Sequence, residues 1–523
     1  MTEKLLEKDL SVLETYFADG TAESEAAFLS SIFVANDLFN RLSSLNSRTP
    51  RLVIGKKGSG KSALVREIAK KWYVEARPAI LLRPKDIAVV GDGGDTLGDL
   101  TSSAELALIK AISVKVGELI NGFLDPELAL LDAEARALGN KSPDFVQRIG
   151  LLLTPVAKLL GYGDGSFDFS ELKPNKARFK AAINSLLTRE KSEVLLVIDD
   201  TDQIARAGGK SDLDRIWALI LACRSIQEDC PGVRCIVVLR SEVWRRLETE
   251  DTAHRDQVDH FRNSIYELSP GSEDVREIFL TRLRAVVDEA RGGAVNNPFD
   301  IFFERRDVAI PTSAGERRSW DDFVVGRSRK RPRDAVQLIS LLASHARNRL
   351  KRDDLKINDK DVESVIRKYS EQRVDDLQIE YGVEFPALKD TLRKFAHAEY
   401  DESGFTFTAQ AARRFIATLP TQMSITLHGV ALRTNRDDDL FKLWSFLYQC
   451  GFLNARIASS SRAKNFDHVR EEEDSTFVAP SRWTEMQASL WEINPAYRDF
   501  LLSVLADSPI GKGLPRKNNR RRP

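Results

Sequence analysis

Sulfur is scarce in this chain, which has only four cysteines and three methionines in 523 residues. The cysteines, Cys223, Cys230, Cys235 and Cys450, form no C-x-x-C pair, and the six histidines are scattered. These spacings argue against a structural zinc site and against a framework of disulfides. We therefore expect the cysteines to be small buried side chains.

The chain also lacks an excess of charge and a long apolar run. Its 78 basic residues balance 78 acidic ones, so no global charge attracts nucleic acid. No run of 18 apolar residues occurs, and Met1-Thr2-Glu3-Lys4 opens an acidic amphipathic segment rather than a signal peptide. Length and composition predict about three globular domains, in the cytoplasm and without a membrane partner.

One segment carries most of the functional information. Residues 51–64 read RLVIGKKGSGKSAL, which matches G-x-x-x-x-G-K-[ST] between an apolar strand and an amphipathic helix. The glycines would let backbone N–H groups wrap around phosphates at the positive end of the helix. Lys61 would reach the β- and γ-phosphates, and Ser62 would bind Mg²⁺. The predicted nucleotide-binding loop comprises Gly55, Lys56, Lys57, Gly58, Ser59, Gly60, Lys61, Ser62 and Ala63.

A second motif supplies acids. The apolar run 194–198 is typical of a central parallel strand, and it ends in Asp199-Asp200-Thr201-Asp202. We expect this strand beside the P-loop strand, with Asp199 as a ligand of Mg²⁺ and Asp200 activating the attacking water. Asp202 is a secondary candidate for either role. The alternative interpretation is a solvated acidic loop that follows a core strand.

A third strand is predicted at 235–239, and Arg240-Ser241 follows it. A polar residue at this position can face the γ-phosphate, so Arg240 is the candidate sensor, with Ser241 behind it. An ordinary surface arginine is the alternative. Strand-like segments at 79–82 and 264–268 complete a predicted α/β core with a parallel five-stranded sheet.

These motifs together resemble the AAA+ class of P-loop ATPases, and within it the STAND- and KAP-type ATPases and the archaeal origin-recognition initiators. The resemblance covers about residues 50–350. It implies ATP and Mg²⁺ as cofactors, ATP hydrolysis and a helical lid after the core. One departure is Asp200, where AAA+ proteins usually carry glutamate. The shorter acid leaves slow, switch-like turnover plausible.

The same resemblance implies further nucleotide contacts. Residues 331–339 are similar to the start of a sensor 2 helix, in which Arg331 or Arg333 would contact the nucleotide. A homo-oligomer is implied, with the site between subunits and an arginine supplied by the neighbour. Candidates for that arginine are Arg245, Arg246, Arg255 and Arg262, each of which could equally be a solvated surface residue.

Composition and periodicity predict five regions. They are an N-terminal helical segment (1–48), the ATPase core (49–271) with a helical insertion at about 85–190, a helical lid (272–375), a winged-helix-like α+β domain (376–507) and a basic disordered tail (508–523). Within the insertion, helices are predicted at 104–119, 126–137 and 144–160. The insertion could recognise a partner protein or cap the core. The basic run 327–333 could supply sensor arginines, bind nucleic acid or be a solvated loop.

The winged-helix interpretation rests on the order of elements in the last third. A helix is predicted at 438–448, followed by strand-like segments at 451–457, 476–478 and 490–495. Winged helices bind DNA or dock proteins, but the apparent wing, residues 463–474, is net acidic. The basic tail could grip DNA or simply solubilise the chain.

We therefore expect a bacterial, Mg²⁺-dependent ATPase that switches or assembles a complex, in a setting such as antiviral defence. A DNA-binding initiator or loader is the first alternative. A scaffold that binds ATP with little turnover is the second.

Overall fold

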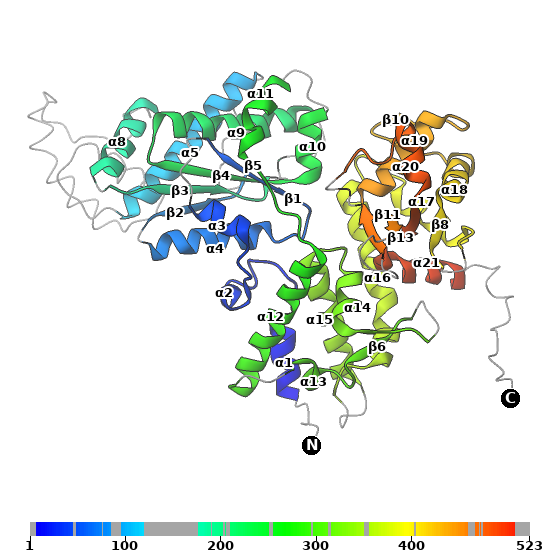
Figure 1. The fold of residues 1–523 in the computed structure, drawn as a ribbon. Coiled ribbons are helices and arrows are strands. Elements are labelled where there is room, and N and C mark those ends of the chain that lie inside the picture. The colour runs from blue at the N-terminus through cyan, green and yellow to red at the C-terminus, as the bar shows by residue number, and fades with distance from the viewer. Residues whose placement is uncertain are drawn as a thin grey trace, which may run out of the picture. The chain divides into compact units, whose positions relative to one another are not determined.

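The computed structural model places the chain in two compact units (Figure 1). The core unit comprises Thr21–Ser269, and the lid unit comprises Met1–Gly20 together with Pro270–Pro523. The structure describes residues 7–44, 49–75, 77–84, 96–119, 176–189, 191–201, 204, 210–249, 255–293, 297–311, 315–349, 355–401, 404–458, 466–469, 471 and 474–507. Among these residues, no helix combines the length and the apolar character needed to cross a membrane.

The core unit is built on a five-stranded parallel sheet. Its strands are β1 (Arg51–Gly55), β2 (Ala79–Leu82), β3 (Val194–Ile198), β4 (Val233–Arg240) and β5 (Ile265–Glu267). Their order is β2-β3-β4-β1-β5, so the predicted parallel α/β core is confirmed. The expected neighbour of the P-loop strand is wrong, because β4 lies between β1 and β3. The long, apolar β4 pairs along both of its edges, and sequence order alone does not fix which strand takes that central place.

Helices cover both faces of this sheet (Figure 1). The helices of the core unit are α2 (Leu29–Ile32), α3 (Asp37–Ser43), α4 (Lys61–Val74), α5 (Leu97–Leu119), α8 (Lys176–Arg189), α9 (Lys210–Asp229), α10 (Ser241–Thr249), α11 (Arg255–Phe261) and the 3₁₀ helix η5 (Arg262–Ser264). Successive strand residues point to opposite faces. Leu52 and Ile54 accordingly pack with α5, α8 and α9, whereas Val53 packs with α3 and α4.

The described part of the predicted insertion belongs to the core. Helix α5 begins earlier than the predicted residue 104, because the Thr96 hydroxyl accepts a hydrogen bond from the Asp99 N–H at 3.2 Å. With α8 and α9 it forms one apolar layer against the sheet. The other predicted insertion helices, at 126–137 and 144–160, lie outside the described residues. So do Asp202 and the tail at 508–523.

The N-terminal segment is divided between the two units. Helix α1 (Glu7–Tyr16) packs in the lid unit against α12 (Ser272–Arg291) and α15 (Pro332–Asn348). Arg282 donates to the Tyr16 carbonyl at 2.7 Å, and Arg291 pairs with buried Asp9 at 2.7 Å. Helices α2 and α3 belong to the core unit instead. The sequence predicted residues 1–48 as one helical segment, whereas the structure divides them between the two units.

The rest of the lid unit continues with helices and small sheets. Its elements are α13 (Phe299–Phe302), β6 (Asp307–Ala309), β7 (Arg317–Ser319), α14 (Trp320–Arg327), α16 (Asp359–Tyr381), α17 (Leu388–Lys394), η6 (Phe395–His397), β8 (Thr406–Thr408), α18 (Ala409–Gln422), β9 (Thr426–Leu427), β10 (Val430–Ala431), α19 (Asp437–Gln449), β11 (Leu453–Ala458), β12 (Phe466–Val469), η7 (Pro480–Arg482), α20 (Trp483–Gln487), β13 (Leu490–Ile493) and α21 (Pro495–Asp507). The last third is thus an α+β domain, with an antiparallel sheet of order β12-β11-β13-β8.

Most elements predicted in this α+β domain are observed. The helix at 438–448 is α19, and the segments at 451–457 and 490–495 contain β11 and β13. The strand predicted at 476–478 is wrong. The chain turns there, with the Phe477 N–H donating to the Asp474 carbonyl at 3.2 Å, and the Phe477 ring packs against Trp491.

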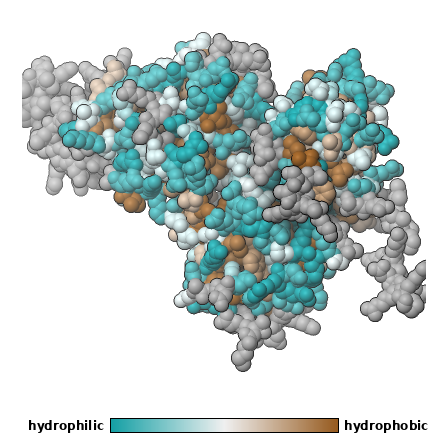
Figure 2. Space-filling view, in the orientation of Figure 1, coloured by the Kyte–Doolittle hydropathy of each residue, from teal (hydrophilic) through white to brown (hydrophobic). Residues whose placement is uncertain are grey.

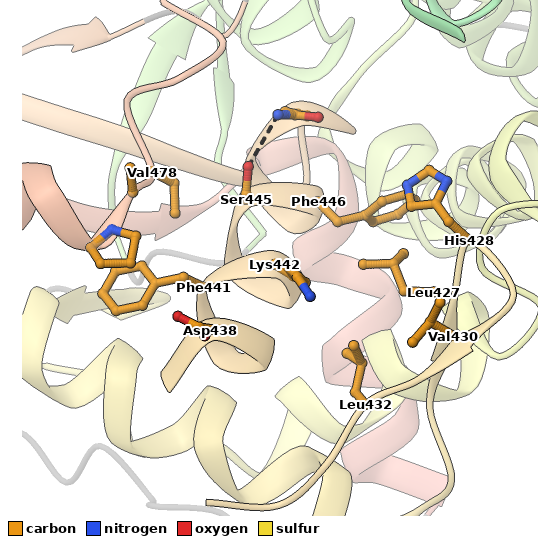
Figure 3. A pocket seen from close by; sticks show the side chains of 13 residues that line it. Leu427, His428, Val430, Leu432, Asp438, Phe441, Lys442, Ser445, Phe446 and Val478 are labelled. Carbon is orange, nitrogen blue, oxygen red and sulfur yellow. Dashed lines mark hydrogen bonds between the residues drawn. The ribbon is translucent and has the colours of Figure 1, made fainter. Parts of the chain in front are cut away.

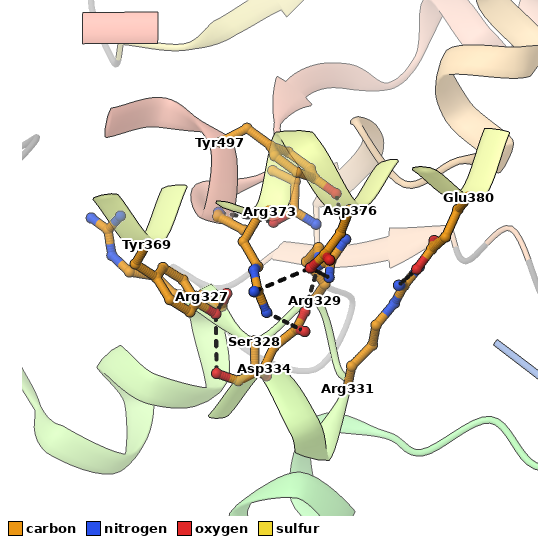
Figure 4. A network of polar contacts seen from close by, with 12 residues as sticks. Arg327, Ser328, Arg329, Arg331, Asp334, Tyr369, Arg373, Asp376, Glu380 and Tyr497 are labelled. Atoms are coloured by element: carbon orange, nitrogen blue, oxygen red, sulfur yellow. Dashed lines mark hydrogen bonds and ion pairs between the residues drawn. The ribbon is translucent and has the colours of Figure 1, made fainter. Parts of the chain in front are cut away.

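A buried network of ion pairs joins α14, α15, α16 and α21 (Figure 4). Asp334 accepts from Arg329 at 2.5 Å and from Arg373 at 2.6 Å. Burial alone would raise the pKa of Asp334. The charges of Arg329 and Arg373 and the hydrogen bond from Arg329 outweigh burial and hold that pKa below its ordinary value. The network therefore keeps a fully enclosed carboxylate ionised.

This network corrects two interpretations of the basic run 327–333. The side chains of Arg327, Arg329 and Arg331 are only 4, 5 and 6% exposed, and each meets a carboxylate. They form neither a solvated loop nor a phosphate-binding patch. Their acidic partners include Glu380 and Asp499, which lie far away in the sequence. Clustered positive charge was therefore visible in the sequence, but its neutralisation was not.

Substituting Asp334→Asn tests the network. The change leaves two buried arginines short of a counter-charge, and we expect it to lower the free energy of unfolding by about 3 kcal/mol at pH 7. Urea unfolding followed by tryptophan fluorescence measures the loss. Asp375→Asn is the matched control, because Asp375 pairs with Lys389 at the surface and should matter by about 1 kcal/mol or less. Equal effects of the two variants would contradict the role of the network.

The effect of Asp334→Asn on stability should also depend on pH. The pKa of Asp334 is lowered by folding, so its ionised form stabilises the folded state. That contribution is complete above the unfolded-state pKa of about 3.9 and is lost as the pH falls through the lower folded-state pKa. The difference between wild type and Asp334→Asn should therefore shrink below about pH 4. Unfolding curves recorded from pH 7 to the acid limit of folding measure it.

Candidate nucleotide-binding site

The loop between β1 and α4 has the backbone geometry of an anion site. Gly58 and Gly60 have φ values of 79° and 100°, which glycine adopts without strain. Gly60 also forms the N-cap of α4, a helix of 14 residues. The loop thus leads its N–H groups to the positive end of a helix, where phosphate is favoured.

Close packing within the loop leaves one polar atom without a partner. A Cβ on Gly55 would lie 2.7 Å from the Leu268 carbonyl oxygen and 2.8 Å from Ser59 Oγ. Ser59 is 5% exposed, and its Oγ makes no hydrogen bond with any described residue. An unsatisfied buried hydroxyl costs about 1–3 kcal/mol. A bound phosphate fits this loop because it would supply the missing partner.

Lys61 is held over the same loop. Its Nζ donates to the Gly55 carbonyl at 2.6 Å and to the Lys56 carbonyl at 2.8 Å. Charged acceptors make stronger hydrogen bonds with an ammonium than neutral carbonyls do. A phosphate could therefore draw the Lys61 ammonium away from these two carbonyls, as the motif predicts.

The strand register brings Arg240 to this loop. Gly55 and Arg240 are the last Cα partners of β1 and β4, so the sensor candidate lies level with the first glycine of the loop. Arg240 has Glu242 at 3.8 Å and its side chain is 26% exposed. The register therefore places Arg240 where a phosphate bound in the loop could contact it.

The acids that follow β3 end at the same edge of the sheet. Asp199 is 7% exposed, and its Oδ1 accepts a hydrogen bond from the Asp200 N–H at 2.8 Å. Asp200 has a φ of 55°, an uncommon conformation for a residue with a side chain. Thr201 then donates to the Val238 carbonyl at 2.6 Å, which fastens this turn to β4.

The residues fit a magnesium ion that is shared with a nucleotide. No cluster of three or more His, Cys, Asp or Glu side chains is placed to hold a metal anywhere in the described ranges. Mg²⁺ commonly keeps several waters and binds one or two carboxylates together with substrate phosphates. Ser62, partly buried at the start of α4, and Asp199 could supply only part of such a shell.

Two charged residues near Asp200 escaped the sequence analysis. Arg83 directly follows β2, and its Nε lies 3.4 Å from Asp200 Oδ2. Glu23 contacts Arg83 and also accepts from Arg66 of α4 at 2.8 Å. Burial would raise the pKa of Glu23, but a backbone hydrogen bond and the two arginines hold it below its ordinary value. The contact of Arg83 with Asp200 follows from the pairing of β2 with β3, which the sequence alone does not give. The position of Arg83 directly after a predicted strand could nevertheless have marked it as a candidate site residue.

The candidates for a neighbour's arginine stay predictions. Arg245 and Arg246 lie on α10, and Arg262 lies in η5 with its side chain 76% exposed and 2.7 Å from Asp259. Arg255 is the first residue of α11, and its side chain falls outside the described part of the structure. The exposure of Arg262 favours it among the side chains that the structure describes.

Arg331 and Arg333 belong to the lid unit, and their assignment to the nucleotide also stays a prediction. Arg331 donates to Glu380 at 2.6 Å, and both side chains are buried. Burial and the charge of Arg329 would lower the pKa of Arg331, but Glu380 and Asp334 raise it above its ordinary value. Leaving this pair would cost about 3–5 kcal/mol. Arg333 makes a weaker contact, with its Nε 3.4 Å from the Gly20 carbonyl oxygen.

The fold and the loop together define a protein with a P-loop α/β core. Residues 273–378, from α12 to α16, match the family described as the FunZ-associated C-terminal helical domain. Over 422 residues the chain is 23% identical to an 80.3 kDa protein assigned to transposon gamma-delta in Escherichia coli (strain K12). That alignment covers 77% of this chain and 56% of the relative, so the chain spans about half the length of this curated relative.

Solved structures give more distant likenesses. The ORC2 protein of Aeropyrum pernix, in ADPNP–ADP complexes, is 12% identical with a TM-score of 0.39, over 92% of this chain and 93% of that one. Cdc6p of Pyrobaculum aerophilum is 11% identical with a TM-score of 0.31, over 96% and 97%. The ORC1 protein of A. pernix in complex with DNA is 12% identical with a TM-score of 0.33, over 98% and 100%. Likeness at this distance supports no argument about function.

Substituting Gly55→Ala tests the loop geometry. The added methyl group would press against the Leu268 carbonyl and Ser59 Oγ, so we expect nucleotide affinity to fall roughly tenfold or more, equal to about 1.4 kcal/mol. Titration with a fluorescent ATP analogue measures it. Gly326→Ala in α14 is the control, because an added Cβ there meets no atom within 4 Å and should leave affinity unchanged. Unaltered binding by Gly55→Ala would count against the loop as the site.

Substituting Arg83→Gln tests the residue that the sequence analysis missed. Loss of the charge beside Asp200 should lower ATP turnover by roughly tenfold and leave nucleotide affinity within about twofold. Arg77→Gln is the matched control, since Arg77 precedes β2 at the opposite end of the strand and pairs with Glu193. Phosphate release under saturating ATP distinguishes the two. Equal turnover in both variants would remove Arg83 from the site.

Proposed function

We propose that this protein is a Mg²⁺-dependent ATPase of the AAA+ class, which uses ATP binding and hydrolysis to switch or assemble a complex. The strongest support for this proposal is the register of the parallel strands. The register of β1 against β4 sets Arg240 level with Gly55, at the edge of the sheet where Asp199 and Asp200 also lie. A phosphate-binding loop, two acids and a basic sensor are the groups that phosphoryl transfer to water requires.

Each group has a distinct part in the proposed reaction. The loop N–H groups and Lys61 would hold the phosphates, and Ser62 and Asp199 would help to hold a magnesium ion, which would supply charge neutralisation at the phosphates. Asp200 orients the attacking water and accepts its proton at the carboxylate. Arg240 contacts the γ-phosphate and is released from it after cleavage. The short side chain of Asp200 fits slow, switch-like turnover.

The wider assembly is part of the same proposal. The AAA+ resemblance implies a homo-oligomer. In that assembly Arg262, or another of the candidate arginines, would reach the nucleotide of a neighbouring subunit. The relative's assignment to a transposon supports a setting that involves mobile DNA, and antiviral defence is one such setting. A scaffold that keeps ATP bound with little turnover is the alternative to be expected if Asp200 does not act on water.

A DNA-binding initiator or loader is the second candidate function. The order of helices and strands in the last third supports a winged-helix-like domain, and such domains can place a helix in the major groove. The exposed acids Asp437 and Asp438 in the first turn of α19 count against that use, because they would repel phosphate charge.

Phosphate release from ATP, measured with and without duplex DNA, tests these functions. Lys61→Ala should abolish binding, and Asp200→Asn should keep binding but lower turnover by roughly 100-fold or more. Lys70→Ala, on the exposed face of α4, is the control and should act as wild type. Turnover that rises with DNA would favour the initiator, whereas turnover by Lys61→Ala equal to wild type would refute the assignment.

A further inference from the structure

Figure 2 shows that hydrophilic residues cover most of the described surface on one face of each unit, with apolar residues in small areas. One apolar feature is hollowed rather than flat. A groove of about 620 Å³, here called the α19 groove, lies in the C-terminal domain of the lid unit (Figure 3). All of its lining residues belong to the lid unit, whereas the P-loop belongs to the core unit.

One face of helix α19 forms the floor of this groove. The helix contributes Asp438, Phe441, Lys442, Ser445, Phe446 and Gln449. Their spacing of three or four residues places them on a single face of the helix. From Asp438 to Gln449 this face extends for about 16 Å at 1.5 Å per residue. The floor is therefore long enough to contact several side chains of a bound segment.

The walls are apolar and fixed by backbone hydrogen bonds. The β9–β10 hairpin stands on one side of α19, with Leu427, Val430 and Leu432, and Val478 lies on the other (Figure 3). The His428 N–H donates to the Glu384 carbonyl at 2.8 Å, which fastens the hairpin turn to the domain. Val430 remains 59% exposed. The groove is thus preformed and keeps apolar surface in contact with water.

One end of the groove carries an acid with no partner. Asp437 pairs with Arg413 at 2.8 Å, and Asp439 has Lys442 and Arg433 at 3.4 Å each. Asp438, between them, is exposed and makes no ion pair or hydrogen bond with any described residue. The Asp438 carboxylate lies in the first turn of α19, exposed to solvent, where a cation of a bound segment can reach it. Apolar walls that end at a free carboxylate complement an apolar segment that carries a basic residue.

We propose that the α19 groove binds a segment of a partner protein in which apolar side chains are accompanied by a lysine or arginine. The apolar side chains pack between the hairpin and Val478, and the basic group pairs with Asp438. Amphipathic segments are commonly recognised in this way, by a preformed groove and a few apolar anchors. The acids of α19 disfavour nucleic acid as the occupant of the same surface.

Selection from a displayed library of random 12-residue peptides tests the groove, with the full-length chain as the target and without nucleotide. The expected result is enrichment of peptides that combine apolar residues with lysine or arginine. The affinity of synthetic copies, measured by fluorescence anisotropy, should fall at least tenfold for Asp438→Lys and for Val430→Asp. Glu363→Lys, which makes the same charge change at an exposed acid of α16, should stay within twofold.

A charge exchange separates recognition from misfolding. Peptides whose basic residue is replaced by glutamate should bind wild type weakly and regain affinity for Asp438→Lys. Failure to enrich any peptide would overturn the proposal, as would enriched peptides that bind Asp438→Lys and Val430→Asp as tightly as wild type. If sedimentation shows that the wild-type chain is a homodimer and that Asp438→Lys is a monomer, the occupant of the groove is a second copy of the chain. That result would overturn the proposal of a separate partner protein. Because no readout depends on ATP, failure here is distinguishable from failure of the proposed ATPase.

Discussion

The hydrogen-bonded register between β1 and β4 is the constraint on which the candidate site depends. It sets Gly55 level with Arg240, and the Thr201 hydroxyl fastens the turn after β3 to the same strand. Because parallel strands end at one edge of their sheet, the loop, the acids and the basic sensor converge at that edge. A shift of either strand by one residue would turn Arg240 toward the opposite face. The site is therefore a property of the sheet as much as of the motifs.

The lid unit depends on a different interaction, the enclosure of charge. Asp334 meets two arginines, and Arg331 is committed to Glu380, so a run that looks like a basic surface is interior structure. Removing one partner from such a network leaves an unpaired buried charge, which is costly. The ion pairs therefore hold the start of α15 firmly against the neighbouring helices. The exposed charges of this unit lie elsewhere, for example at Asp438 beside the α19 groove. Charge in this protein therefore has separate structural and recognition roles.

Sequence patterns predicted what local chemistry determines. The P-loop glycines, the buried strand before Asp199 and the helix at 438–448 each follow from periodicity or from motif spacing, and the structure has all three. Contacts between residues that are distant in the sequence could not be predicted from these patterns. The position of β4 between β1 and β3, the contact of Arg83 with Asp200 and the burial of Arg331 each join residues that are distant in the sequence. The turn at Phe477 misled for another reason, since its apolar residues pack into the core without forming a strand.

The most direct test of the central claim is hydrogen–deuterium exchange of residues 55–63, read by mass spectrometry with and without ATP and Mg²⁺. Backbone N–H groups that wrap around phosphates should exchange more slowly when ATP is present. Peptides from β3 serve as the internal reference, because that strand is buried in either condition. Protection confined to the loop and the start of α4 is the result that we predict. Unchanged exchange in 55–63 at saturating ATP would contradict the assignment of this loop as the nucleotide site.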